Sequence, residues 1–456
     1  MSSETFLLLG ILLFAAITVI ALLSYYFPIH PLTHKHIRHR TTISGIRDVL
    51  ERTRDSQLQT RATANQALEH AFGLHPDIST FVSGDRETND AFRRHAYRLI
   101  SNSTFVELAD IARQAVDTTL ANYVGDIPYA ELIQVATFRF VVCGLLVPGT
   151  TPDELGHTHV REATRLITAI WLLSKQSSAN TTYLRNQLKD HLDALFPADP
   201  SIIQLESLNP IWETFWRVVA PLFAQLRLGG SRLEDTRNAF EDFLELPTTA
   251  QFHALRCNNT APSAKYASLE ALRAWSPVSR IKRQHTTTHE SRLTRWFWLP
   301  TWLARRITSV ETTVDVADIE AAHRSEYWAV PLPSTSSTGP GPATVGVVPP
   351  DPNVYDPSRF LLEPQRAADV LAFGHGPLQC IAARWAPLAI GLMVGALLDR
   401  INDVESRLVP ASGAGTNSPG GGASRDPKGW EGWRVVKLQQ REQRPFGAGA
   451  ASPRGV

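Results

Sequence analysis

The sequence has little cysteine and no excess of either charge. Only three cysteines occur among its 456 residues, too few and too scattered for a disulfide framework or a four-cysteine zinc site. The 45 lysine and arginine residues nearly balance the 44 aspartate and glutamate residues, so the formal net charge is only +1. The chain therefore lacks the positive field that attracts nucleic acid, and we predict no nucleic-acid partner. Glycine-rich nucleotide loops, HExxH and GxSxG are also absent from the contexts that nucleotide-binding proteins, zinc proteases and serine hydrolases require.

A long apolar run lies near the N-terminus. Residues 5–27 contain no charged side chain and are long enough, as a helix, to cross a bilayer. A cleaved signal peptide is the alternative, but the run is longer than a signal core, has no basic leader and ends in aromatic residues. Only Glu4 is charged before the run, whereas basic residues follow it, so the positive-inside rule places the bulk of the chain in the cytosol. We predict a single-pass anchor at 1–27 and a basic juxtamembrane linker at 28–46.

The composition of the chain changes along its length. Apolar residues recur at helical spacing up to about residue 282. A basic, tryptophan-rich stretch at 283–310 and a Ser/Pro/Gly stretch at 332–349 are typical of surface insertions. Residues 411–456 have a flexible-linker composition that is interrupted by a short strand-like patch, GWRVVKL. We therefore expect a catalytic domain over residues 47–410, with two insertions, and a flexible C-terminal tail.

The third cysteine follows a glycine-rich turn. Gly374 and Gly376 precede Cys380, which opens an apolar, helix-like run. We expect Cys380 to lie at a helix N-terminus, where free amide groups and the helix dipole lower the pKa of a thiol. The resulting thiolate is a ligand for iron, and amide groups of a loop with few side chains can donate hydrogen bonds to its sulfur. On this segment alone, a buried and unreactive cysteine remains the alternative.

This segment resembles the haem-binding loop of the cytochrome P450 family. In that pattern, Phe is followed by Gly, Cys and then Gly or Ala at fixed spacing, and Phe373, Gly376, Cys380 and Ala382 fill it here. The resemblance implies that these residues bind haem b and that Cys380 is the axial iron ligand. The basic residue that usually precedes the cysteine by two positions is Leu378 in this chain. The resemblance therefore implies that one haem propionate would lack its usual partner here.

Two further segments resemble P450 motifs in the same order along the chain. Glu270 and Arg273 match the ExxR helix, and Arg359 matches the third member of the family's Glu-Arg-Arg network. Between them, HRSEYW at 323–328 resembles the family's HRD-type segment. Taken alone, Glu270 and Arg273 would be an ordinary exposed ion pair. In this order, the three segments imply a network that clamps the protein beneath the haem.

A long apolar segment precedes these motifs. The spacing of apolar residues over 208–230 predicts a helix with one strongly apolar face. Glu213 and Thr214 are consecutive in it, as the acid and alcohol are in the P450 helix over the haem, and the resemblance implies that they relay protons for oxygen activation. The structural alternative is that Glu213 faces solvent and Thr214 bonds a backbone carbonyl.

A basic run offers another contact for a propionate. Arg94, His95 and Arg98 lie where the third P450 helix usually sends a basic side chain to this group. A run this basic is most often a solvated helix face, which is the structural alternative.

Together, these resemblances imply a mainly α-helical, P450-like fold with small β-sheets, plus one N-terminal transmembrane helix. The implied activity is insertion of one oxygen atom from O2 into a lipophilic small molecule, with secondary metabolism as one setting. No flavin or nicotinamide motif is present, so the electrons would come from an NADPH-dependent flavoprotein reductase. The predicted location is the endoplasmic reticulum membrane, with a cytosolic catalytic domain. Two alternatives remain, a haem-thiolate isomerase or dehydratase that needs no reductase, and a degenerate, non-catalytic anchored member.

Overall fold

The computed structural model describes most of the chain after residue 32. The described residues are 10–11, 14–15, 18, 33–51, 54–176, 180–197, 205–289, 309–329, 351–402, 406–409 and 427–437. The chain divides into two units. The smaller unit comprises residues 1–39 and 283–316, and the larger comprises residues 40–282 and 317–456.

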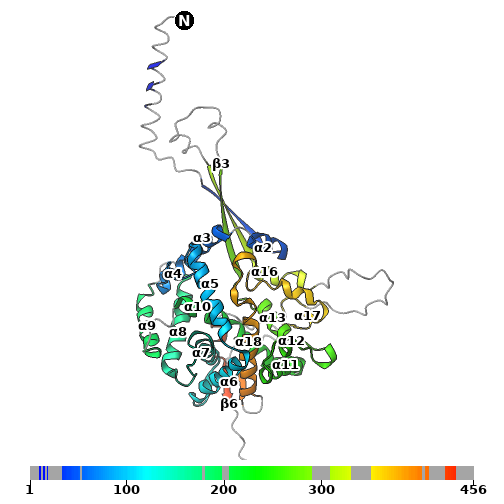
Figure 1. Ribbon diagram of the computed structural model, residues 1–456. Coiled ribbons are helices and arrows are strands. Elements are labelled where there is room, and N and C mark those ends of the chain that lie inside the picture. The colour runs from blue at the N-terminus through cyan, green and yellow to red at the C-terminus, as the bar shows by residue number, and fades with distance from the viewer. Residues whose placement is uncertain are drawn as a thin grey trace, which may run out of the picture. The chain divides into compact units, whose positions relative to one another are not determined.

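Helices make up most of the larger unit (Figure 1). The longer helices are α5 (Arg86–Asn102), α6 (Phe105–Ala121), α7 (Tyr129–Val141), α8 (His157–Leu173), α9 (Thr182–Leu195), α10 (Leu205–Leu228), α11 (Glu234–Glu245), α13 (Ala264–Ala274) and α18 (Ala386–Arg400). The shorter helices are α2 (Ile43–Leu50), α3 (Arg54–Ala64), α4 (Gln66–Phe72), α12 (Thr249–His253), α16 (Ile319–His323) and α17 (Arg359–Leu362). A π-helical turn, η1 (Val142–Leu146), continues α7. The prediction of a mainly helical fold with small sheets is confirmed.

Helices α5 and α6 begin where the sequence supplies polar caps. The Asp85 carboxylate accepts a hydrogen bond from the Thr88 amide at 2.6 Å, and this hydrogen bonding lowers the pKa of Asp85. At α6, the Thr104 hydroxyl accepts from the Glu107 amide at 3.2 Å, while the Glu107 carboxylate accepts from the Thr104 amide at 2.8 Å. These caps satisfy amide groups that have no partner within the helix, so they fix the first turn of each helix.

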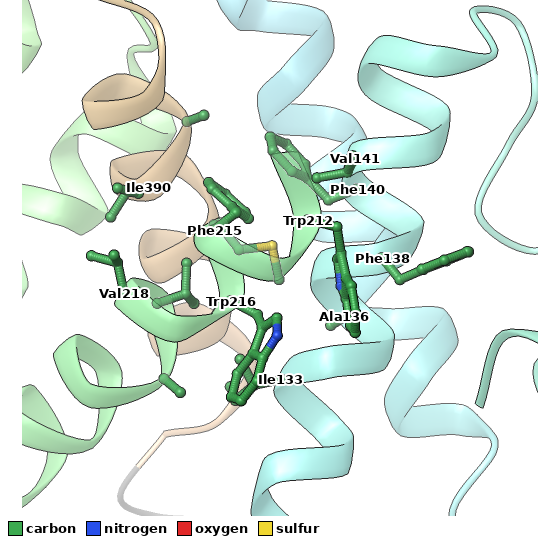
Figure 2. Close-up of a cluster of buried hydrophobic side chains, with 14 of the residues drawn as sticks. Ile133, Ala136, Phe138, Phe140, Val141, Trp212, Phe215, Trp216, Val218 and Ile390 are labelled. Carbon is green, nitrogen blue, oxygen red and sulfur yellow. The ribbon is translucent and has the colours of Figure 1, made fainter. Parts of the chain in front are cut away.

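Helix α10 is packed into the hydrophobic core beside α7 (Figure 2). The rings of Phe140 and Phe215 stack with their centroids 5.6 Å apart. The Trp212 ring meets Phe138 edge-on at 6.0 Å, and its indole N–H donates to the Gln134 carbonyl oxygen at 3.1 Å. Since close-packed aromatic rings tolerate little displacement, these contacts fix the position of α10.

Within the described part of the chain, one helical run is long and apolar enough to cross a membrane, Tyr129–Leu146. This run is 89% buried inside the protein, as the packing of α7 in the core requires. Most of the predicted anchor at 1–27 lies outside the described residues. Those of its residues that are described are helical, namely Gly10, Ile11, Phe14, Ala15 and Thr18. The N-terminal transmembrane helix stays a prediction.

Part of the predicted flexible tail forms a strand. Strand β6 (Arg434–Lys437) lies between β2 (Ile127–Pro128) and β5 (Ser406–Val409), and it is antiparallel to both. Just before β6, Trp430 is buried, and its ring lies 5.0 Å from that of Tyr129. The predicted strand-like patch therefore forms a strand. It belongs to the packed domain, because it contributes apolar surface to the core, so this part of the expected flexible tail is packed.

A second sheet contains three strands in the order β1-β4-β3. Strand β1 (Thr33–Arg40) lies in the segment that was expected to be a linker, and β3 (Arg280–His289) enters the first expected insertion. The third strand, β4 (Ser309–Asp318), lies between them. These two segments therefore supply paired strands, while the expected insertion at 332–349 lies outside the described residues.

Candidate functional site

The loop that carries Cys380 is closed by backbone hydrogen bonds. The Cys380 amide donates to the Phe373 carbonyl oxygen at 2.9 Å. Gly374 and Gly376 each have a φ angle of +72°, a conformation that side chains disfavour. Phe373 and Ala382 are half-buried and pack against the main core. The loop thus holds the backbone of Cys380 in a fixed turn, and Cys380 is an exposed residue.

Gly376 approaches the end of α2 closely. A β-carbon on Gly376 would lie 2.6 Å from the Leu50 carbonyl oxygen, nearer than such atoms can approach without a shift. The neighbouring His375 places its Nε2 atom 2.8 Å from Oε1 of Glu51. The cysteine loop is therefore docked on the C-terminal end of α2, and a side chain at position 376 would separate the two.

We predict that Gly376→Ala destabilises the protein more than Gly125→Ala does. Both glycines have positive φ, +72° and +81°, but no atom lies within 4 Å of a β-carbon on Gly125. The control variant, Gly125→Ala, should lower the free energy of unfolding by about 1–2 kcal/mol, because alanine disfavours the left-handed backbone. Gly376→Ala should lose a further 1–3 kcal/mol or so, because the loop must also move away from Leu50. Free energies of unfolding measure both, and equal losses would contradict the close contact.

Cys380 does not lie at the start of a long helix. It precedes a short 3-10 turn, η7 (Ile381–Ala383), and α18 begins only at Ala386. Pro387 falls in the first turn of α18, where proline is tolerated, so it does not kink the helix interior. The predicted position of Cys380 is wrong because a tight turn separates the cysteine from the helix.

The predicted lowering of the thiol pKa is also wrong for the protein alone. Surrounding atoms desolvate the sulfur and raise the pKa of Cys380, although the Ala382 amide and the positive charge of Arg93 act in the opposite direction. Without the amide groups of a long helix, the turn does not offset this desolvation. A bound metal cation would reverse the balance, because a coordinating thiol loses its proton.

A groove of about 530 Å³ lies beside the cysteine loop. It is lined by Asp90, Arg93, Arg94, Tyr97, Arg98 and Ile381. Arg93 Nη1 donates to the Gln379 carbonyl oxygen at 3.0 Å. Of the three basic residues predicted to meet a propionate, Arg94 and Arg98 line this groove, and His95 does not. Arg93 was not among the predicted residues, because the sequence does not show which side of α5 faces the cysteine loop. The neighbouring arginines at 93 and 94 were the only signal that could have pointed to it.

Glu270, Arg273 and Arg359 come together in a buried ion network. None of them is more than 3% exposed. Two donors of Arg273 reach the Glu270 carboxylate, each at 2.8 Å, and Arg359 Nε donates to it at 2.9 Å. Arg359 also donates to the Trp328 carbonyl oxygen at 2.8 Å. The alternative of an exposed ion pair does not hold, because these charges are enclosed and satisfied by one another and by the backbone.

His323 connects this network to the cysteine loop. Its carbonyl oxygen accepts a hydrogen bond from Arg273, and its ring Nε2 accepts one from the Leu371 amide at 3.0 Å. Burial lowers the pKa of His323 to about 3, so the ring stays neutral near pH 7. Because Leu371 lies two residues before Phe373, the network holds the start of the cysteine loop.

The structure gives Glu213 and Thr214 separate hydrogen-bond partners. Glu213 is fully buried, forms an ion pair with Arg217 and accepts from the Trp216 indole N–H at 3.0 Å. Burial raises the pKa of Glu213, while Arg217 opposes that change. The Thr214 hydroxyl donates to the Pro210 carbonyl oxygen at 2.7 Å, as the structural alternative predicted. The other half of that alternative, a solvent-facing Glu213, is wrong, and the proton relay stays a prediction.

Comparison with known proteins identifies the architecture. No family model matches the chain, and no curated protein matches it. A six-coordinated cytochrome P450 from Thermus thermophilus aligns with a TM-score of 0.53 at 15% identity, covering 88% of this chain and 92% of that one. CYP175A1, from another strain of Thermus thermophilus, aligns with a TM-score of 0.52 at 15% identity, covering 86% and 89%. The chain has the cytochrome P450 fold.

The residues of this P450 fold suit a haem at the cysteine loop. Cys380 offers a soft sulfur ligand for iron, and the Ala382 amide is directed at that sulfur. Arg93, Arg94 and Arg98 offer positive charge beside the loop for carboxylates, although Leu378 has none. Thiolate ligation with a hydrogen bond to the sulfur is established iron chemistry. The donor set therefore fits a haem-thiolate site.

Proposed function

We propose that this chain is a haem-thiolate monooxygenase that inserts one oxygen atom from O2 into a lipophilic small molecule. The observation that carries the proposal is the Cys380 loop, which His323 joins to the buried network around Glu270 within a P450 fold. Cys380 would hold haem b, with Phe373, Gly376 and Ala382 around it. When bound, the haem would supply the redox chemistry of O2.

The chain's own residues would bind and position the cofactor. The Ala382 amide donates toward the Cys380 sulfur and favours its charged form. Guanidinium groups of α5 would neutralise the propionates, in place of the basic residue that Leu378 replaces. Phe373 packs against the core and fixes that side of the loop. The neutral His323 ring accepts the Leu371 amide hydrogen bond and so positions the segment that leads to Phe373.

The proposal includes a partner and a location. An NADPH-dependent flavoprotein reductase would donate electrons, because the sequence has no nicotinamide or flavin motif. The apolar run at 5–27 would anchor the protein in the endoplasmic reticulum membrane, with the larger unit in the cytosol. Lipophilic substrates dissolve in the same membrane, which would concentrate them near the enzyme.

A haem-thiolate isomerase or dehydratase is the second candidate, and the surroundings of α10 favour it. Glu213 is held by Arg217 and Trp216, and the Thr214 hydroxyl bonds its own helix. Neither residue is hydrogen-bonded to the other in this arrangement. An enzyme that rearranges a peroxide substrate needs no proton relay and no reductase, so this function is compatible with both side chains as they stand.

Spectra and oxidant requirements test the proposal. A carbon monoxide difference spectrum of reduced membranes should show a haem-thiolate band, and its absence would leave the degenerate, non-catalytic alternative. Product formation that requires NADPH, reductase and O2 supports monooxygenation, whereas turnover of a lipid peroxide without them supports the second candidate. In a monooxygenase that uses Thr214, Thr214→Ala should uncouple oxygen consumption from product formation. Unchanged coupling would assign Thr214 to the helix alone.

A further inference from the structure

Two histidines on neighbouring helices bring their ring nitrogens together far from the cysteine loop in sequence. His159 lies in the first turn of α8, and His191 lies in the last turns of α9. Their Nδ1 atoms are 3.0 Å apart, and the ring centroids are separated by 5.3 Å. Both residues are half-buried. The cysteine loop and its network do not involve this pair.

The distance between these nitrogens is close to the spacing of two imidazole ligands on one metal ion. Bonds of about 2.05 Å from metal to imidazole nitrogen place two ligands about 2.9 Å apart at a right angle and about 3.3 Å apart at the tetrahedral angle. The observed 3.0 Å between the two Nδ1 atoms is close to the right-angle spacing of square-planar or octahedral coordination, but as hydrogen-bond partners the two nitrogens face each other, so the rings must turn to bind one ion. Rotation about χ2, which is broad for histidine, would direct both lone pairs to one point.

We propose that His159 and His191 form a two-histidine site for a divalent transition ion of the copper or nickel type. Imidazole is a preferred ligand of these ions, and their affinities for nitrogen sites exceed those of the earlier metals of the series. Among the described residues, no group of three or more His, Cys, Asp or Glu side chains surrounds a common point. Water would complete the coordination, so the ion would join α8 to α9.

Without metal, the same nitrogens share one hydrogen bond. One ring carries its proton on Nδ1 and donates it to the bare Nδ1 of the other ring. Metal binding requires both rings to carry their proton on Nε2, so the donor ring changes tautomer and no net proton is released. Helix dipoles add little, because the α8 end near His159 is positive and the α9 end near His191 is negative.

Calorimetric titration of the tag-free full chain with Cu²⁺ and Ni²⁺ tests the site. We expect one of the bound ions to depend on this pair, with an affinity that His159→Gln and His191→Gln each weaken by about tenfold or more, because each removes one of two protein ligands. Zn²⁺, which prefers tetrahedral sites, should bind more weakly than Cu²⁺. Nitrogen hyperfine splitting in the Cu²⁺ paramagnetic resonance spectrum should show two imidazoles and lose one in either variant.

His157→Gln is the matched control. This residue is on the same helix and is half-buried, but its ring packs edge-on against Tyr123. His157→Gln should bind the ion as the native protein does. Equal affinities in the native protein and both variants of the pair would overturn the proposal. An equal loss in His157→Gln would also overturn it, because it would indicate adventitious binding by surface histidines.

Discussion

Cys380→Ser should abolish the haem-thiolate spectrum and leave the fold intact. A serine hydroxyl does not ionise near pH 7, so it cannot supply the soft, electron-rich ligand that a thiolate gives iron. The loop contact made at this position belongs to the backbone, since the Cys380 amide donates to Phe373, and serine preserves it. Serine is close to cysteine in shape, so the free energy of unfolding of the haem-free proteins should differ by no more than about 1 kcal/mol.

Cys257→Ser is the matched control for this experiment. Cys257 is also an exposed, free cysteine, and its thiol lies 3.4 Å from a carboxylate oxygen of Asp235. The control should keep the native spectrum and haem content after expression with ample haem. Difference spectra of the reduced carbon monoxide complexes, with thermal unfolding of each protein, provide the comparison. Identical bands in the native protein and in Cys380→Ser would show that another residue binds the iron.

Local spacing predicts some parts of the site and leaves others undetermined. The pattern from Phe373 to Cys380 and the Glu270–Arg273 pair are short-range features, and the structure brings both into one connected arrangement. The environment of Glu213 is different. Whether a carboxylate faces solvent or pairs with Arg217 depends on which side of α10 meets the core, and two tryptophans in the same helix obscure the apolar stripe.

Pairing between distant segments explains what the sequence misses in the fold. Strand β6 is four residues long and follows a glycine-rich stretch, so its place between β2 and β5 depends on partners that lie far away in the chain. Strand β1 is polar and basic, which favours a linker by composition. The turn η7 after Cys380 likewise packs against α5, which lies far away from it in the sequence. Such contacts leave no local periodicity.

Glu270→Gln should destabilise the protein by about 3–5 kcal/mol, because it leaves buried positive charge without its counter-ion. Glu270 accepts hydrogen bonds from Arg273, from Arg359 and from the Asp356 amide at 2.9 Å. A neutral amide cannot balance the two guanidinium charges, and its NH2 group faces donors. Arg273 and Arg359 also donate to backbone carbonyl oxygens of Pro352 and Val354, and this loop would loosen as well. Free energies of unfolding in denaturant and the yield of soluble protein measure the effect.

Glu162→Gln tests the same chemistry at the surface. Glu162 and Arg165 have the same spacing along a helix as Glu270 and Arg273, and their atoms approach to 2.7 Å, but their side chains are 24% and 57% exposed. Water solvates either partner when the other is lost, so the control should cost less than about 1 kcal/mol. Spacing, residue types and substitution are identical in the two pairs, so the contrast measures the burial of Glu270 together with its additional partners, Arg359 and the Asp356 amide. Similar losses in both variants would mean that the network around Glu270 contributes no more than an ordinary surface ion pair.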